Sequence, residues 1–282
     1  MYIRAKKVKS DQYLYLVKSV WDSKKNTSKQ ETIKYLGKAT HVLNDDIPID
    51  YRNDPKILSG LAKYNPKDVE KRNVALKKIK QQLYKKMTNG DVQETLKIYE
   101  EYIKNFDTVD FFDKILKPVM SEIGSDWENN KISIATEHVA SNIAQTLVKN
   151  IMDQVKRNDN KKKILICVPV GEEHHLGCDV LETYLSSKGF KIYNMGTSMP
   201  TESILNFIDN NKPDAIIISI TIKDNLLAGQ RLVRKINKEC NIPIFIGGLA
   251  IQEKNIPKFD GKIIGDMDLK EIKKEIGCEI NG

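Results

Sequence analysis

The chain has 282 residues, a formal net charge of +8, and 40% hydrophobic beside 30% charged residues. This balance is typical of a folded globular protein and excludes wholesale disorder, and no run reaches the roughly 20 apolar residues that a membrane-spanning helix needs. We therefore expect a cytoplasmic protein of two or three packed domains without a membrane partner. The four cysteines lie far apart, which argues against a zinc ribbon and a disulfide framework.

The charge is concentrated at the front of the chain. Residues 1–90 hold 21 Lys and Arg against 9 Asp and Glu, a net charge of +12, whereas the remaining residues hold 25 against 29, a net charge of −4. The basic character therefore belongs to the first third of the molecule.

Residues 1–42 are predicted to form a small basic β-meander domain. Residues 1–9 alternate in polarity, residues 12–21 are rich in β-branched and aromatic side chains, and residues 30–36 form a third short run. Residues 43–65, which contain Pro48 and Pro55, are predicted to be a linker.

Residues 66–157 have a helical period and are predicted to form a four-helix bundle. The first helix carries the stripe Leu76, Ile79, Leu83 and Met87 and ends at Gly90. Three further helices are expected near residues 91–106, 110–127 and 133–155, joined by short loops. The fourth has the clearest apolar stripe, which comprises Ala135, Val139, Ile143, Leu147, Ile151 and Val155.

After a charged break at residues 157–163, residues 162–282 alternate short apolar strands with helices. This order predicts an α/β domain with a doubly wound parallel sheet of the flavodoxin or Rossmann type, whose ligand binds beyond the carboxyl ends of the strands. The strands are expected at residues 164–170, 190–194, 215–220, 244–247 and 262–264.

The loop after the first of these strands lacks a phosphate-binding signature. No GxGxxG follows the strand and no GxxxxGK[ST] occurs in the chain, so a nucleotide site loses its main support. The loop instead contains Glu172, His174 and Gly177. A carboxylate beside an imidazole suits metal ligation, because a hydrogen bond to one ring nitrogen fixes the tautomer and raises the basicity of the other. The alternative is a solvated loop with surface histidines.

Glu172-x-His174-x-x-Gly177 resembles the [DE]xHxxG motif of cobalamin-binding domains. Two later elements of that family also have counterparts, at Ser219-Ile220-Thr221 and at Gly247-Gly248. The resemblance implies that His174 replaces the cofactor's own base as the lower ligand of cobalt, and that the nucleotide tail of the cofactor lies between the strands.

The bundle carries a second resemblance. Trp127, followed after nine residues by Glu137-His138, is similar to the Wx9EH signature of adenosylcobalamin-dependent photoreceptors of the CarH/LitR type. The resemblance implies that Trp127 packs on the adenosyl group and that Glu137 and His138, with Ile134 on the same helix face, lie beside it. Some family members have a histidine directly after the tryptophan, where this chain has Glu128. The alternative is a packed tryptophan and a solvated Glu-His pair.

The front of the chain is unlike the winged helix-turn-helix of these regulators. It weakly resembles the small β domain at the start of some transposases, and its lysines alternate with Tyr2, Tyr13, Tyr15, Trp21 and Tyr35. Such strands are suited to contact the phosphates and bases of DNA or RNA. Equally, the tyrosines could form a core and the lysines a solvated face.

The combined patterns predict a light- or cobalamin-responsive sensor that binds adenosylcobalamin between the bundle and the α/β domain and is not an enzyme. Family analogy also implies a homo-oligomer. Two alternatives remain open. One is a corrinoid carrier subunit of a methyltransferase system, which predicts an apolar cap, and the other is a module that stores or delivers cobalamin.

Overall fold

The computed structural model describes residues 1–8, 11–22, 27–39, 42, 46–52, 54–62, 64, 66–104, 106–155, 162–253 and 255–281. The chain divides into two compact units, Met1–Gln81 and Gln82–Gly282, and the division falls within helix α2 (Pro66–Thr88). The charged break predicted at residues 157–163 lies mostly outside the described residues. None of the helices that the structure describes combines the length and apolar character needed to cross a membrane.

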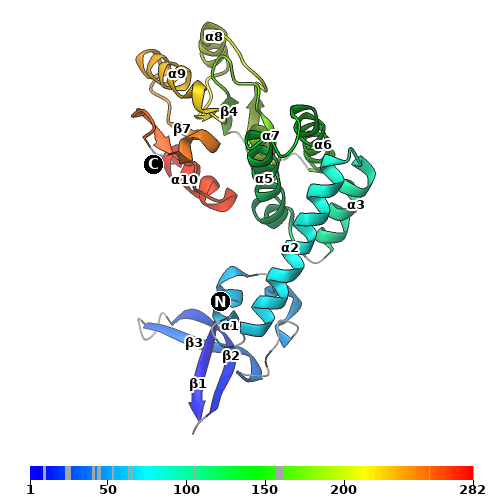
Figure 1. The fold of residues 1–282 in the computed structure, drawn as a ribbon. Coiled ribbons are helices and arrows are strands. Elements are labelled where there is room, and N and C mark those ends of the chain that lie inside the picture. Colours follow the sequence, from blue (N-terminus) through cyan, green and yellow to red (C-terminus); the bar gives the residue numbers. More distant parts are fainter. Residues whose placement is uncertain are drawn as a thin grey trace. The chain divides into compact units, whose positions relative to one another are not determined.

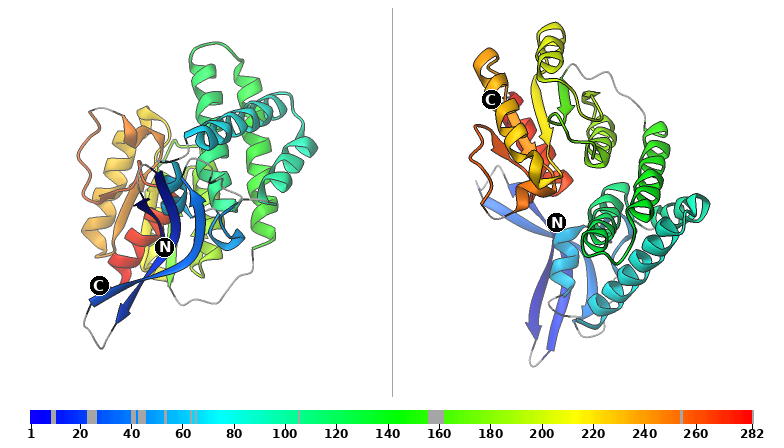
Figure 2. Two further views of the ribbon diagram at one scale, coloured as in Figure 1. Left: turned by 90° about the horizontal axis from the view of Figure 1, so that it is seen from below. Right: turned by 45° about the horizontal axis from the view of Figure 1, so that its top comes forward.

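The first unit is built on an antiparallel sheet. Strands β1 (Tyr2–Val8), β2 (Asp11–Asp22) and β3 (Thr27–Lys38) pair in the order β1-β2-β3, which agrees with the predicted meander. Alternate residues of a strand point to opposite faces, so Leu14 and Leu16 share one face and are fully buried there. Helix α1 (Pro55–Ala62) packs next to β1 (Figure 2).

The core of this unit includes part of the segment that we expected to be a linker. Ile47, Ile57 and Leu61 pack with Leu14 and Leu16. A short 3-10 helix, η2 (Ile49–Tyr51), lies between Ile47 and Ile57 in the sequence. Apolar residues in this segment are too sparse to show a period, so the sequence gives no local sign that they cover the sheet. Residues 43–45, 53, 63 and 65 of the expected linker lie outside the described residues.

The second unit begins with helices, and a side chain caps the first turn of three of them. Asp91, Asp107 and Ser133 accept the backbone N–H groups of Glu94, Asp110 and Thr136 at 3.1, 2.7 and 3.1 Å. The predicted third helix is divided by a π-helical turn. The elements are α3 (Val92–Ile103), α4 (Thr108–Phe111), the π turn η3 (Phe112–Leu116), α5 (Lys117–Glu128) and α6 (Ile134–Asp153).

The buried face of α6 differs from the predicted stripe. Ala135 and Val139 are exposed, and the buried apolar residues are Ala140, Ile143, Ala144, Leu147, Val148 and Ile151. Residues four apart are offset by about 40° around a helix, so a stripe with only four-residue steps turns away from the core. The observed face alternates steps of three and four.

The remainder of the second unit is a five-stranded parallel sheet in the order β5-β4-β6-β7-β8, which confirms the predicted doubly wound α/β fold. Its strands are β4 (Lys163–Cys167), β5 (Lys191–Asn194), β6 (Ala215–Ser219), β7 (Ile244–Gly247) and β8 (Lys262–Ile263). Helices α7 (Leu176–Ser187) and α10 (Leu269–Asn281) cover one face, and α8 (Thr201–Asn211) and α9 (Leu226–Glu239) cover the other (Figure 1). The strand order reverses beside β4, at the carboxyl ends where ligands of such sheets bind.

Candidate functional site

Glu172 lies in the loop after β4 and is completely buried. Its Oε1 accepts the backbone N–H of His174 at 3.1 Å, and its Oε2 accepts the backbone N–H groups of Thr221 and Ile222 at 2.9 Å each and the Asn225 amide at 3.1 Å. Burial alone would raise the pKa of Glu172, but these hydrogen bonds and the one from the His174 ring lower it to about 2. The carboxylate is therefore ionised and ties the loop after β4 to the loop after β6.

The ring of His174 is oriented by this carboxylate. Its Nδ1 lies 2.8 Å from Oε1 of Glu172, and because an ionised carboxylate only accepts, Nδ1 carries the hydrogen. That bond raises the pKa of His174; burial opposes it, and the charges of Glu172, Glu137 and Glu173 add to the rise. The side chain is 41% exposed. In the neutral ring, Nε2 is left with a lone pair, the arrangement that a metal-binding imidazole needs.

Of the two later motif elements, residues 219–221 lie next to the loop that contains Glu172, and residues 247–248 lie next to residues 219–221. Ser219 is buried at the end of β6, and Thr221 contributes its backbone N–H to Glu172. Gly248 has a φ of 101°, and a Cβ built on it would lie 2.2 Å from the carbonyl oxygen of Ile220. No side chain fits there, so Gly248 allows β7 to pass closely over the turn that follows β6. Gly247 is less restricted, since its Cβ would lie 3.4 Å from Ile264.

Gly177, the second residue of α7, has a different environment. A Cβ on this residue would meet only the Ser219 hydroxyl oxygen, at 4.0 Å. The protein itself therefore has room for a side chain at this position. The glycine keeps the space in front of Ser219 open, between α7 and the carboxyl end of β6, which fits a bound group that enters between these elements.

The predicted residues of the bundle lie around the start of α6. Glu137 is buried, accepts a hydrogen bond from the Ser141 hydroxyl at 2.5 Å and lies 2.6 Å from Nδ1 of His138. The carboxylate of Glu137 is therefore turned inward and held by its neighbours on the same helix. Ile134 and His138 are exposed, and Trp127 is partly buried in the last turn of α5.

Helix α6 faces the His174 loop with polar groups. It packs against α7, and the Gln145 amide nitrogen lies 3.4 Å from Nε2 of His175. The charge of Glu137 reaches His174, whose pKa it helps to raise. Among the described residues, no hydrogen bond or ion pair joins Trp127, Ile134 or His138 to this loop.

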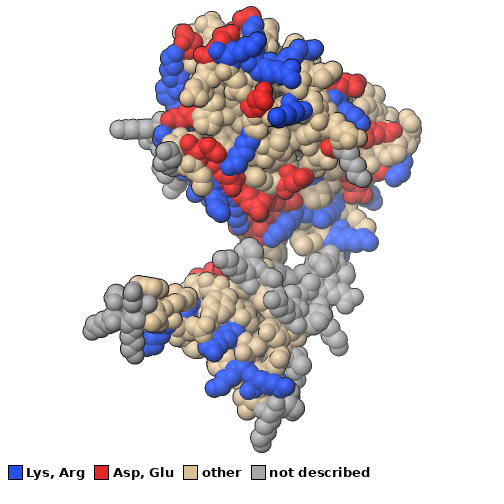
Figure 3. Space-filling model, turned by 90° about the vertical axis from the view of Figure 1, so that its left-hand side faces the viewer, with Lys and Arg blue, Asp and Glu red and all other residues tan. Residues whose placement is uncertain are grey.

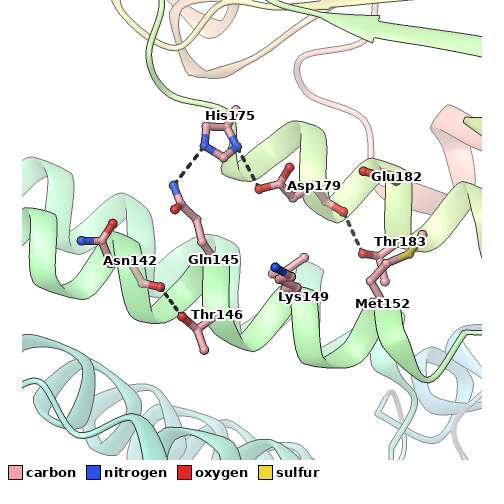
Figure 4. Close-up of a pocket in the computed structure, with 10 residues that line it drawn as sticks. Asn142, Gln145, Thr146, Lys149, Met152, His175, Asp179, Glu182 and Thr183 are labelled. Atoms are coloured by element: carbon pink, nitrogen blue, oxygen red, sulfur yellow. Dashed lines mark hydrogen bonds and ion pairs between the residues drawn. The ribbon is translucent and has the colours of Figure 1, made fainter. Parts of the chain in front are cut away.

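A cavity of about 510 Å³ between α6 and α7 contains groups that the sequence motifs did not indicate (Figure 4). His175 Nδ1 lies 2.9 Å from Asp179, and the Asn194 amide bridges Asp179 and Glu182 at 2.9 Å each. The four-residue spacing of His175 and Asp179 at the start of a helix is the one sequence signal that would have indicated this pairing.

Comparisons with known proteins find relatives of both the bundle and the α/β domain. Residues 79–151 and residues 162–268 each match the model of a B12 binding domain. The HTH-type transcriptional repressor CarH of Myxococcus xanthus is 20% identical over 155 residues, 54% of this chain and 52% of the repressor. The trimethylamine corrinoid protein 1 of Methanosarcina acetivorans is 21% identical over 197 residues, 67% of this chain and 91% of that protein.

Among solved structures, the monomethylamine corrinoid protein of Methanosarcina barkeri superposes with a TM-score of 0.61 at 18% identity, over 72% of this chain and 99% of that one. This likeness concerns the fold. The chain spans about half the length of CarH and of the related repressor CarA, which is 21% identical over 161 residues.

The chain therefore belongs to the B12-binding domain proteins, and the two matched segments together cover more than half of it. Within that class it resembles the CarH type of regulator as well as corrinoid proteins, and cobalamin is the ligand that these matches support.

Proposed function

We propose that the chain binds adenosylcobalamin base-off, with His174 as the lower ligand of cobalt, between the helical bundle and the α/β domain. We propose further that it acts as a light- or cobalamin-responsive regulator and not as an enzyme. The observation that carries the proposal is the buried, ionised Glu172, which holds the hydrogen on Nδ1 of His174 and leaves Nε2 for a metal.

The other motif residues fit this ligand. Open space at Gly177 and the buried hydroxyl of Ser219 suit an extended tail that enters beside β6, and Gly248 shapes the turn next to it. When bound, adenosylcobalamin supplies a photolabile cobalt–carbon bond. The part of the protein is to orient His174, to enclose the upper face and to respond when the fit between helices and ligand changes, since a ligand shifts a protein only through different affinities for its states.

Residues at the start of α6 support the adenosyl form. Glu137 is a buried carboxylate whose two visible partners, Ser141 and His138, leave it further acceptor capacity for ribose hydroxyls. Trp127 offers a ring for stacking on adenine. A cap that only shielded a methyl group would be apolar, so this polar pair favours the regulator.

A corrinoid carrier in methyl transfer is the second candidate. The observation in its favour is coverage, because the match to one Methanosarcina corrinoid protein covers 91% of that protein and the structural match to another covers 99% of it. A module that stores or delivers cobalamin would use the same His174 loop without regulation or methyl transfer.

Absorption spectra distinguish these candidates. The purified chain is mixed in the dark with adenosylcobalamin or methylcobalamin and then exposed to green light. We expect tighter binding of the adenosyl form and an irreversible change after the light, and we expect Trp127→Ala to reduce the preference for the adenosyl form. Equal affinity for both forms in the wild type would favour the carrier, and a light response no different from that of the free cofactor would refute the photoreceptor.

The output is proposed to involve a nucleic acid bound by the basic first unit and a homo-oligomer of the chain. Sedimentation of the cobalamin-loaded protein before and after light tests the oligomer, and an unchanged monomer in both states would contradict it.

A further inference from the structure

The sheet of the first unit has two unlike faces. Leu14 and Leu16 on β2 point into the core with Ile3, whereas the alternate residues Tyr13 and Tyr15 point to the opposite face. The pairing register places Arg4, Tyr15 and Tyr35 side by side across the three strands, and Lys6, Tyr13 and Lys38 side by side in the next row. We call these six residues, together with Trp21 further along β2, the aromatic face.

The rings of this face form a connected surface that remains accessible. The Tyr35 ring centroid lies 5.1 Å from that of Tyr15 and 6.4 Å from that of Tyr13. Tyr35 is 53% exposed and Trp21 is 64% exposed. Tyr13 and Tyr15 are partly buried and lie outside the core cluster of this unit. The three tyrosine rings of this face therefore form a partly exposed platform, with the exposed Trp21 further along the same strand.

The charge on this face is positive. Arg4 and Lys6 are exposed, and Asp11, the one acidic side chain at a register position of this face in the described strands, is paired with Lys38 at 2.9 Å. Glu31 pairs with Lys18 on the other face. Figure 3 shows the first unit, the lower body in that view, with Lys and Arg and very little acidic surface, whereas the second unit has both signs intermingled.

We propose that the aromatic face binds single-stranded nucleic acid. Exposed bases would stack on Tyr35, Tyr15 and Trp21, and the phosphates would pair with Arg4 and Lys6. A single strand is favoured over a duplex as the ligand of this face. Bases inside a duplex already stack on one another and present only their edges, which aromatic rings cannot stack on. An acidic protein would be attracted by the same charges but would leave the rings without a partner.

This inference deepens the proposed nucleic-acid partner of the first unit and is independent of cobalamin. The test uses the full-length chain and a fluorescent oligothymidylate of about 20 nucleotides, followed by anisotropy between about 50 and 200 mM salt. We expect binding that weakens as salt rises, and much weaker binding of the same length of duplex. Cobalamin binding is followed separately by absorbance, so its failure would not affect this result.

Three variants identify the face. Tyr35→Ala is expected to weaken binding by about tenfold, as for the loss of one base stack. Lys6→Glu is expected to weaken binding and to reduce its salt dependence. Lys7→Glu is the matched control, because it makes the same charge change on the next residue of β1, whose side chain points to the opposite face. We expect Lys7→Glu to bind several-fold more tightly than Lys6→Glu.

Equal effects of Lys6→Glu and Lys7→Glu, tighter binding of the duplex, or equal competition by polyglutamate would overturn the proposal, and so would the absence of binding. If Tyr35→Ala disturbs the sheet, the fluorescence of Trp21 in the Trp127→Phe chain provides an independent measurement. The oligonucleotide should quench it if bases stack on Trp21, and unchanged emission at saturation would contradict the stacking.

Discussion

Glu172 determines the protonation of the His174 ring through its negative charge and through the hydrogen bond that it accepts from Nδ1. A buried carboxylate without partners would be neutral, but the N–H groups of two loops and the His174 ring keep this one ionised. The same bonds determine which nitrogen of His174 can meet a metal. The side chain of Glu172 therefore joins two loops and fixes the tautomer of His174.

Replacing Glu172 with Gln keeps the shape of the side chain but removes its charge. Whichever way the amide is turned, an NH₂ group would face N–H donors, so we expect a loss of about 3 kcal/mol in the free energy of unfolding, measured with urea. Glu173→Gln is the matched control, because Glu173 is exposed, and it should change stability by less than about 0.5 kcal/mol. Equal stability of the two variants would show that the network around Glu172 contributes little.

Gly248 and Gly177 should respond differently to alanine. Gly248→Ala places a methyl group against the carbonyl of Ile220 at a positive φ, so we expect a loss of about 3 kcal/mol or more in unfolding free energy. Gly177→Ala has room and lies in a helix, so its stability should stay within about 1 kcal/mol of the wild type. Its cobalamin affinity should nevertheless fall. Unimpaired cobalamin binding by Gly177→Ala would contradict the proposed path of the ligand tail.

At the scale of elements, the bundle and the α/β domain meet at the start of α10. Asp113 in the π turn accepts the backbone N–H of Leu269, the first residue of that helix, at 3.4 Å. Burial raises the pKa of Asp113 to about 6, and the nearby Asp268 adds to the rise, while the Leu269 bond and Lys117 oppose it. This contact therefore joins the two domains through a carboxyl group that titrates in a physiological range.

Stability should depend on pH at this contact. The folded-state pKa of about 6 lies above the ordinary value of 3.8, so between these values the folded chain holds a proton that the unfolded chain lacks. The contribution of Asp113 to the free energy of unfolding is therefore lost as pH rises from about 4 to about 6. Asp113→Asn should be more stable than the wild type by about 1–2 kcal/mol at pH 8, with little difference at pH 4. The exposed Asp209→Asn serves as control, and an equal pH response in both variants would contradict the assignment.

Elements with a regular period were predictable from the sequence, whereas their packed faces were less so. The five apolar runs of the sheet and the helices that separate them follow directly from composition, and the caps Asp91 and Ser133 mark helix starts. The observed buried face of α6 differs from the predicted apolar stripe because Val139 is apolar yet exposed, and Glu137 is charged yet buried. Burial of a carboxylate depends on Ser141 and His138 and is not visible in hydrophobic periodicity.

At the scale of the whole molecule, the division of charge in the sequence follows the division of the chain into units. The +12 front, residues 1–90, contains the unit with the aromatic face, and the two B12 binding domain matches, which begin at residue 79, lie mostly in the remainder. The sequence motifs alone indicated the loop of His174 and its partner Glu172. They could not indicate that Gly248 is needed for backbone packing, or that His175 and Asp179 line a cavity, because both depend on segments far apart in the sequence.

If His174 ligates the cobalt of bound cobalamin, electron paramagnetic resonance of the cobalt(II) form should detect the nitrogen of this residue. The chain is labelled with ¹⁵N-histidine, so that a histidine ligand splits the cobalt lines into doublets, whereas the cofactor's own ¹⁴N base gives triplets. We predict doublets in the labelled wild type and in labelled His175→Gln, and their loss in His174→Ala. Triplets in the labelled wild type, or doublets that persist in His174→Ala, would show that His174 is not the ligand of cobalt.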